Sequence, residues 1–161
     1  MDTDQQVMLI NTIKEFMDFL GVSGDVVIPE KRQHDMVVVT IASPNDSGVL
    51  IGKQGLHLSA VEHLVRLIVN QKAIYAGHES FPPFILDVNN YRAMRTDAVT
   101  QLARTTARKV QQNRRAESLH PMNSYERRIV HAELTSFEGV ATESVGNEPD
   151  RRVIIKPRSD Y

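Results

Sequence analysis

The chain has 161 residues, 41% of them hydrophobic and 24% charged, a composition typical of a globular protein with a packed core and not of a disordered one. It contains no cysteine, which excludes disulfide frameworks and thiolate zinc sites and indicates a reducing compartment. The acidic start, Met1 to Asp4, and the short apolar runs predict neither a signal peptide nor membrane insertion, so we expect a cytoplasmic protein.

The beginning of the chain predicts a helix and a hairpin. Apolar residues recur at helical spacing from Val7 to Leu20, and Gly21 follows at the position of a left-handed C-cap. Two runs rich in β-branched residues, 25–29 and 36–42, are joined by the charged segment 30–35. Such runs are typical of paired strands, so an antiparallel hairpin is expected here.

A glycine turn follows the hairpin. The short segment 48–51 leads into Gly52-Lys53-Gln54-Gly55, and apolar residues at helical spacing continue from Leu58 to Ile68. If the short segment is also helical, two helices flank the turn. Residues 84–88 predict a third strand. We therefore expect residues 1–89 to form one α+β domain with the order α-β-β-α-α-β.

Residues 90–157 predict a second, smaller α+β domain, followed by a tail at 158–161. Its first element is a long helix from Asn90 to about Arg115. The apolar side of this helix is expected to include Tyr91, Met94, Ala98, Leu102 and Val110, and the opposite side to carry Arg104, Arg108 and Arg115. With no Gly/Ser-rich linker in the sequence, the boundary between the domains is expected to be tight.

The rest of the second domain predicts a helix and a terminal hairpin. Asn123 with Glu126 three residues later is typical of a capping box, and the helix is expected to run to about Phe137. Two short β-rich runs, 140–145 and 153–155, follow.

Positive charge is concentrated in one segment, although the chain as a whole carries a net charge of only −1. Residues 91–131 contain nine Lys or Arg and three Asp or Glu, a net charge of +6. Such a segment predicts a local anion-binding face, although a solvated helix rich in arginine would give the same pattern.

The turn Gly52-Lys53-Gln54-Gly55 has a physical use in binding an anionic chain. Glycines lack the Cβ atoms that would keep a sugar-phosphate backbone at a distance, and Lys53 adds a charge for phosphate. The following helix begins here, so its free N–H groups face the same anion. The alternative is a tight turn between two helices with no binding role.

The residues around this turn resemble a known family. Val49-Leu50-Ile51 before it, Leu58 and Val61 after it, and the order α-β-β-α-α-β are similar to the type II KH domain of bacteria. The resemblance implies that the loop Gly52 to Gly55 clamps the backbone of about four nucleotides of single-stranded nucleic acid.

A second candidate site is Arg127-Arg128-Ile129-Val130-His131. Arg127 and His131 lie one helical turn apart, so they project to the same side, where a guanidinium and an imidazole can bind one phosphate. A protonated His131 would add charge near its ordinary pKa of about 6.5. The alternative is that His131 flanks the core and Arg127 is solvated.

The surroundings of this pair also carry a resemblance. Asn90-Tyr91-Arg92, the run from Pro121 to His131, and Arg151 to Ile155 are similar to the small domain family named for its Arg-x-x-x-His motif, which is implicated in binding single-stranded nucleic acid. A KH domain followed by this domain resembles the bacterial Jag family, here without the family's usual N-terminal Jag domain. The resemblance implies a post-transcriptional or cell-elongation regulator and, as a possible partner, a second, smaller KH-domain protein.

The sequence contains no motif for catalysis. The six histidines show no HxH or HExxH spacing, and Gly52-Lys53 is followed by Gln54 where a phosphate-binding P-loop has Ser or Thr. We therefore expect no enzyme activity, no metal and no cofactor. With no tryptophan and 6% aromatic residues, backbone clamping is expected in place of a broad stacking platform, and sequence specificity should be modest.

The sequence thus predicts a binder of single-stranded RNA. Single-stranded DNA remains an alternative ligand, and a protein-interaction or ribosome-associated subunit remains an alternative function. The residues expected to contact nucleic acid are Gly52, Lys53, Gln54, Gly55, Arg92, Arg104, Arg108, Arg127, Arg128 and His131.

Overall fold

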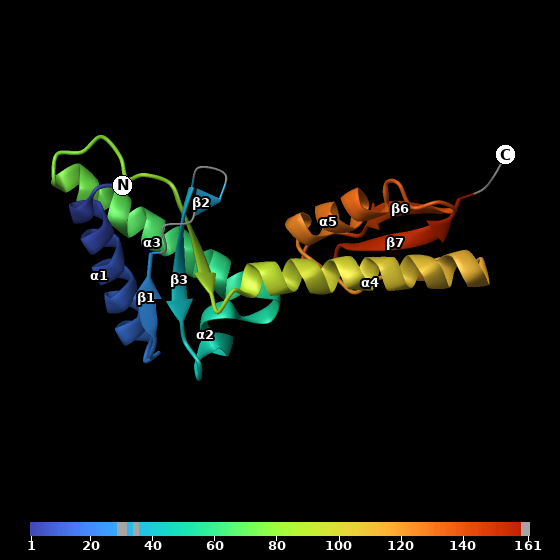
Figure 1. Ribbon diagram of the computed structural model, residues 1–161, viewed down its shortest axis with the longest axis horizontal. Coiled ribbons are helices and arrows are strands. Elements are labelled where there is room, and N and C mark those ends of the chain that lie inside the picture. Colours follow the sequence, from blue (N-terminus) through green and yellow to red (C-terminus); the bar gives the residue numbers. More distant parts are fainter. Residues whose placement is uncertain (29–31, 34–35, 159–161) are drawn as a thin grey trace. The chain divides into compact units, whose positions relative to one another are not determined.

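The computed structural model describes residues 1–28, 32–33 and 36–158. The chain divides into two compact units, Met1–Arg92 and Ala93–Tyr161, hereafter unit 1 and unit 2 (Figure 1). Each unit has a hydrophobic core of its own. None of the helices in the described ranges is long and apolar enough to cross a membrane.

Unit 1 contains the elements expected from the sequence, in the expected order, with one short strand added. The elements are α1 (Thr3–Leu20), β1 (Asp25–Val27), β2 (Arg32–Gln33), β3 (Met36–Ala42), α2 (Ser47–Ile51), the 3-10 turn η1 (Lys53–Gly55), α3 (Leu56–Tyr75) and β4 (Phe84–Val88). The first strand ends at Val27, two residues earlier than expected. Of the predicted turn 30–35, only the two residues of β2 are described.

Two local signals account for the limits of α1. Asp2 accepts a hydrogen bond from the backbone N–H of Gln5, whose side chain accepts one from the N–H of Asp2, and together these form a capping box. Gly21 ends the helix with φ 67°, so the predicted left-handed C-cap is confirmed.

The sheet of unit 1 is mixed. Strand β3 pairs antiparallel with β1 and β2 and parallel with β4. Alternate residues of β3 and β4 are fully buried, namely Val39, Ile41, Phe84, Leu86 and Val88. These side chains pack with Leu9, Ile13 and Met17 of α1 and with Leu58, Val61, Val65 and Val69 of α3 in one core. The alternation follows from the two-residue period of a strand.

Unit 2 packs two helices with a three-stranded antiparallel sheet. Its elements are α4 (Tyr91–Asn113, which begins in the last residues of unit 1), β5 (Glu117–Ser118), α5 (Ser124–Leu134), β6 (Val140–Val145) and β7 (Arg152–Pro157), and β7 lies between β5 and β6. Strand β5 was not expected. The first helix ends two residues early because Arg114 takes a φ of 53°, and the second ends at Leu134, three residues before Phe137.

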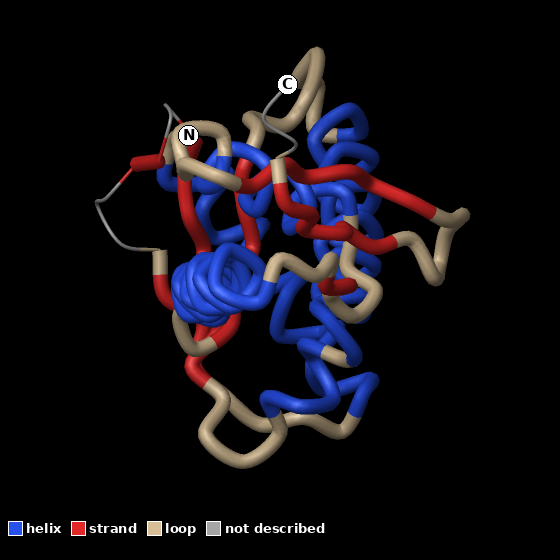
Figure 2. Tube along the Cα trace, turned by 90° about the vertical axis from the view of Figure 1, so that its right-hand side faces the viewer, coloured by secondary structure: helices blue, strands red, loops and turns tan. Residues whose placement is uncertain are grey.

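The buried side of α4 agrees only in part with the side predicted. Figure 2 shows this helix almost end-on. Its buried residues are Val99, Ala103, Ala107 and Val110. Val110 was expected there, and Leu102 packs against the same core, whereas the expected residues Met94 and Ala98 are exposed. Alanines let a helix approach its neighbours closely, but they contribute little to an apolar stripe in the sequence, so the pattern missed the part of the buried side that Ala103 and Ala107 form.

Candidate functional site

The predicted turn of unit 1 has an unusual backbone. Gly52, Gln54 and Gly55 have φ angles of 66°, 55° and 77°, and these positive values turn the chain sharply from α2 into α3. Lys53 lies at the tip with its side chain exposed. The turn therefore presents backbone and one cation to solvent.

Both glycines are also required by their neighbours within the fold. A Cβ atom on Gly52 would lie 2.3 Å from Cγ of His57, and one on Gly55 would lie 3.0 Å from Cε1 of Tyr91. The ring of His57 is held over the turn, with Nδ1 2.8 Å from the carbonyl oxygen of Val49. The glycines thus have a structural use whether or not an anion binds, and the sequence did not reveal this role of His57.

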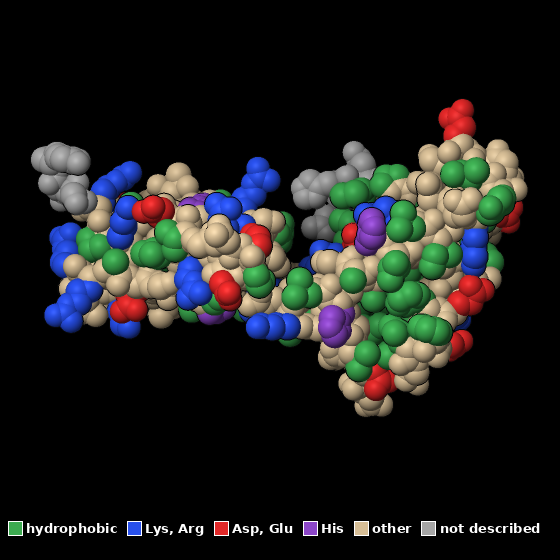
Figure 3. Space-filling view, turned by 180° about the vertical axis from the view of Figure 1, so that it is seen from behind, with side chains coloured by type: hydrophobic (Ala, Val, Ile, Leu, Met, Phe, Trp, Pro, Cys, Tyr) green, Lys and Arg blue, Asp and Glu red, His purple; other side chains and the backbone are tan. Residues whose placement is uncertain are grey.

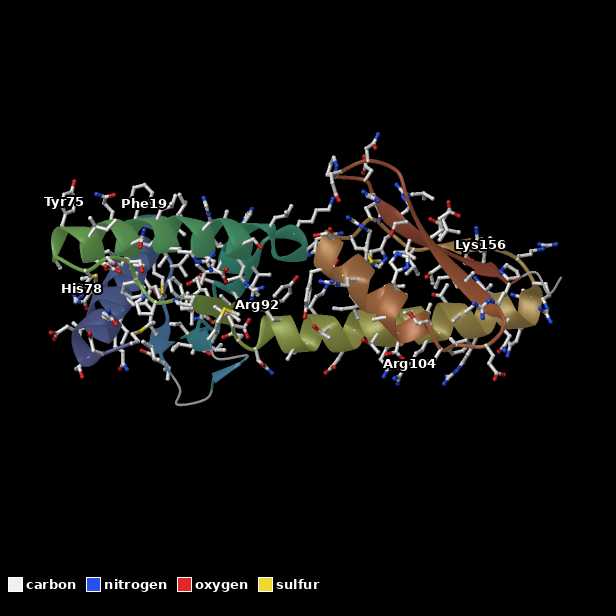
Figure 4. All side chains as sticks on the ribbon, turned by 90° about the horizontal axis from the view of Figure 1, so that it is seen from above. Phe19, Tyr75, His78, Arg92, Arg104 and Lys156 are labelled. Carbon is white, nitrogen blue, oxygen red and sulfur yellow. The ribbon has the colours of Figure 1, made fainter. Side chains whose placement is uncertain are left out.

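Arg92, predicted to contact nucleic acid, lies within unit 1 between α3 and β4 (labelled in Figure 4). Its Nη2 donates to Oε2 of Glu62 at 2.8 Å, and its Nε donates to the carbonyl of Leu86 at 3.0 Å. The other oxygen of Glu62 pairs with Arg66 at 2.8 Å. Arg92 therefore links the helix to the strand, a structural role that was not predicted.

The predicted basic face of α4 is present but partly neutralised. Nε of Arg104 donates to Oε1 of Glu133 at 2.6 Å, and both side chains remain accessible. One turn later, Arg108 is exposed. Lys109 pairs with Glu117 at 2.8 Å. Fewer cations are thus freely available on this helix than the charge count of the sequence suggested.

Arg127, Arg128 and His131 line one open depression on unit 2. Ser124, Tyr125 and Ser144 complete its lining, and its volume is about 550 Å³. Five of the six residues belong to α5, whose start is capped by the side chain of Asn123 accepting from the N–H of Glu126 at 2.9 Å. The sixth comes from the neighbouring strand β6.

Arg127 is neither solvated nor free. The residue is only 7% exposed, its Nη1 donates to the carbonyl of Met122 at 2.7 Å, and its Nη2 contacts Oε1 of Glu148 at 2.7 Å. The alternative of a solvated Arg127 is therefore wrong. Its guanidinium is thus held by a backbone carbonyl on one side and by a carboxylate on the other.

His131 is held by two hydroxyl groups of β6. Nδ1 lies 2.7 Å from Oγ1 of Thr142, and Nε2 lies 2.7 Å from Oγ of Ser144. Burial lowers the pKa of His131 below its ordinary value, and the positive charge of Arg127 lowers it further. Protonation near pH 6.5, as the sequence suggested, is thus disfavoured relative to a free imidazole.

A buried ion pair joins α4 to the start of α5. Nε of Arg95 donates to Oε1 of Glu126 at 2.6 Å, and the Glu126 side chain is only 3% exposed. This contact holds α5, and with it the depression, against α4.

Three residues that line the depression were not predicted, namely Ser124, Tyr125 and Ser144, and neither was Thr142, which contacts His131 from β6. Ser144 and Thr142 lie two residues apart on β6, so both side chains point to the same face, but that period alone does not indicate which helix they meet. Tyr125 lies three residues before Arg128, on the same side of α5, which was a usable signal. Within the described ranges, no group of three or more His, Asp or Glu side chains is arranged to hold a metal ion.

Comparison with known proteins identifies the second part of the chain. The Arg-x-x-x-His domain family, abbreviated R-3-H, matches residues 97–157, so the predicted domain is confirmed over this range.

Comparison over nearly the whole chain finds bacterial relatives named RNA-binding protein KhpB. The protein of Clostridium symbiosum is 36% identical over 146 residues, which cover 91% of this chain and 63% of that protein. For Lactiplantibacillus plantarum the identity is 37% over 150 residues, covering 93% and 43%. The Bacillus subtilis protein is 31% identical over 157 residues, covering 96% and 70%.

The chain thus spans between about two fifths and seven tenths of the length of these three relatives. Their name describes proteins that bind RNA. Because nearly all of the chain aligns with most of the Bacillus subtilis protein, and because the Arg-x-x-x-His domain match includes the depression on α5, the chain belongs to the KhpB family.

Proposed function

We propose that the chain binds single-stranded RNA and carries out no reaction on it. The observation that carries this proposal is the depression of unit 2, where Arg127, Arg128 and His131 meet on α5. Guanidinium groups and helix N-termini suit phosphate oxygens, and the depression lies inside the Arg-x-x-x-His domain of a chain whose relatives are named RNA-binding proteins.

We propose a second RNA-binding site in unit 1, which we interpret as a type II KH domain. Support comes from its element order, its mixed sheet and the turn between α2 and α3, where backbone and the exposed Lys53 face solvent. In KH domains such a loop clamps the backbone of about four nucleotides, and a clamp on the backbone gives modest sequence specificity.

Replacing Lys53 and Gln54 with Asp tests the loop. Asp tolerates the left-handed conformation of position 54, so the turn can persist while two carboxylates face the phosphates. Affinity for a short single-stranded RNA should fall at least about tenfold, or about 1.4 kcal/mol. The matched control is Lys14→Asp with Gln71→Asp, which makes the same charge change at exposed positions of α1 and α3. An unchanged affinity in a folded loop variant would refute RNA binding by this loop.

The salt dependence of binding tests whether phosphate contacts supply the affinity, and a comparison of ligands tests whether single-stranded RNA is preferred. The slope of log K against log salt is about −0.7 per phosphate neutralised on single strands, so about four to six contacts should give roughly −3 to −4. Matched single-stranded RNA, single-stranded DNA and duplex RNA should be compared in the same titration. Sequencing the RNA that crosslinks to the protein in cells would then test a role as a post-transcriptional regulator.

A second candidate function is binding of a protein partner by unit 1, for instance a second, smaller KH-domain protein. Leu64, Leu67 and Ile68 lie on one side of α3 and are all exposed, and Figure 3 shows hydrophobic side chains gathered on this face. An apolar surface of this kind suits a protein better than RNA. A complex that forms without RNA, resists salt and is lost in Leu67→Glu would support this function.

A further inference from the structure

Tyr125 occupies a distinct place in the depression of unit 2. It is the second residue of α5, it is 62% exposed, and it lines the depression together with Arg127 and Arg128. Of the described residues of unit 2, only Tyr125 and Phe137 carry Phe, Tyr or Trp rings, and Phe137 packs against the core. The exposed ring is therefore found where the cationic groups are, and not scattered elsewhere on this unit.

A single exposed aromatic ring is common on protein surfaces and by itself needs no explanation. Here the ring adjoins groups that suit phosphate oxygens, so one depression offers a cationic part and a flat apolar part. Its volume of about 550 Å³ lies within the range of small-ligand sites. Nucleotides carry both an anionic phosphate and a planar base, which matches this pairing, whereas inorganic phosphate needs only the cations.

We propose that Tyr125 stacks on one base of the bound strand while the adjoining phosphate lies against Arg127 and Arg128. The inference rests on the proposed function and adds a base-binding subsite to the proposed phosphate-binding site. Stacking on a tyrosine ring accepts every base, since each has a flat π-face, so the subsite distinguishes nucleic acid from other phosphate ligands without selecting a sequence. It is one stacking residue, and not the broad platform that the composition disfavoured.

The test compares two strands of equal length, a short single-stranded RNA and an abasic ribose-phosphate chain. Tyr125→Ala should bind the RNA about tenfold more weakly, which corresponds to about 1.4 kcal/mol, and should bind the abasic chain as the parent does. Tyr125→Phe keeps the ring and should stay within about twofold of the parent on both strands. Equal affinity of the parent and Tyr125→Ala for the RNA would overturn the inference, as would equal losses on both strands.

A spectroscopic readout supplements the affinities. The chain contains no tryptophan, so Tyr125→Trp introduces a single one, whose emission should be quenched by the RNA and not by the abasic chain. Equal quenching by both strands, or none by RNA that binds, would overturn the inference. Failure of the proposed function itself looks different: the parent would bind neither strand, or Arg128→Ala would leave the affinity for both strands unchanged.

Discussion

Glu148 forms an ion pair with the guanidinium of Arg127. The carboxylate lies in the turn between β6 and β7 and contacts Nη2 at 2.7 Å, so it holds the guanidinium edge that a phosphate would use. We predict that Glu148→Gln raises RNA affinity about threefold or more, because a competing negative charge is removed. Glu143→Gln is the matched control, since that carboxylate pairs with Lys156 on the exposed surface. Weaker binding by Glu148→Gln in titrations would show instead that Glu148 positions Arg127.

His131 should make unit 2 sensitive to acid. Burial and Arg127 lower its pKa in the folded state, so the unfolded chain binds the proton more readily. The resulting stability is complete above the ordinary pKa of about 6.5 and is lost as the pH falls through the folded value. Melting temperatures should thus fall more steeply between about pH 7.5 and 5 for the parent than for His131→Gln. The other five histidines are present in both proteins, so parallel curves would contradict the prediction.

At the scale of elements, α5 depends on α4 through the pair Arg95 and Glu126. Arg95→Ala leaves the Glu126 carboxylate buried without its ion-pair partner, and we predict a loss of about 3–5 kcal/mol in the free energy of unfolding. Arg104→Ala also breaks a contact between these helices, but the Arg104 and Glu133 side chains are 46% and 25% exposed, so the cost should be at most about 1 kcal/mol. Chemical denaturation of both variants measures the difference, and similar costs would refute it.

The same element-scale argument changes how Arg127 can be used as a probe. Removing its side chain would leave the Met122 carbonyl and the Glu148 carboxylate without their partner, so Arg127→Ala alters stability and binding together. Arg128 is exposed and lines the same depression, which makes it the cleaner residue to replace.

At the scale of the whole molecule, two binding sites that act on one strand predict that affinity increases with RNA length. Once one unit has bound, the other meets the strand at a high effective concentration, so long RNA should bind more tightly than a four-nucleotide RNA. Arg128→Ala should remove most of this advantage and leave binding of the short RNA nearly unchanged. Arg158→Ala removes one exposed arginine that does not line the depression and serves as the control. If the curve of affinity against length for Arg128→Ala shifts equally at all lengths relative to the parent, binding of one strand by both units is contradicted.

The sequence by itself determined the features that depend on neighbours along the chain. Helical spacing from Val7 to Leu20, the cap at Gly21 and the alternation in β3 follow from short-range geometry, and the structure agrees. The pair Arg127 and His131 was found in the same way, because residues one turn apart on a helix must share a side.

Only the tertiary structure decided what these side chains contact. Arg92 meets Glu62 across 30 positions, His131 meets two hydroxyl groups on β6, and Arg127 meets Glu148 from a distant turn. Such partners lie close together only after the elements have packed, and periodicity within one element contains no information about the element opposite. For the same reason the alanine side of α4 was missed: the sheet and α5, not the helix, select the face that is buried.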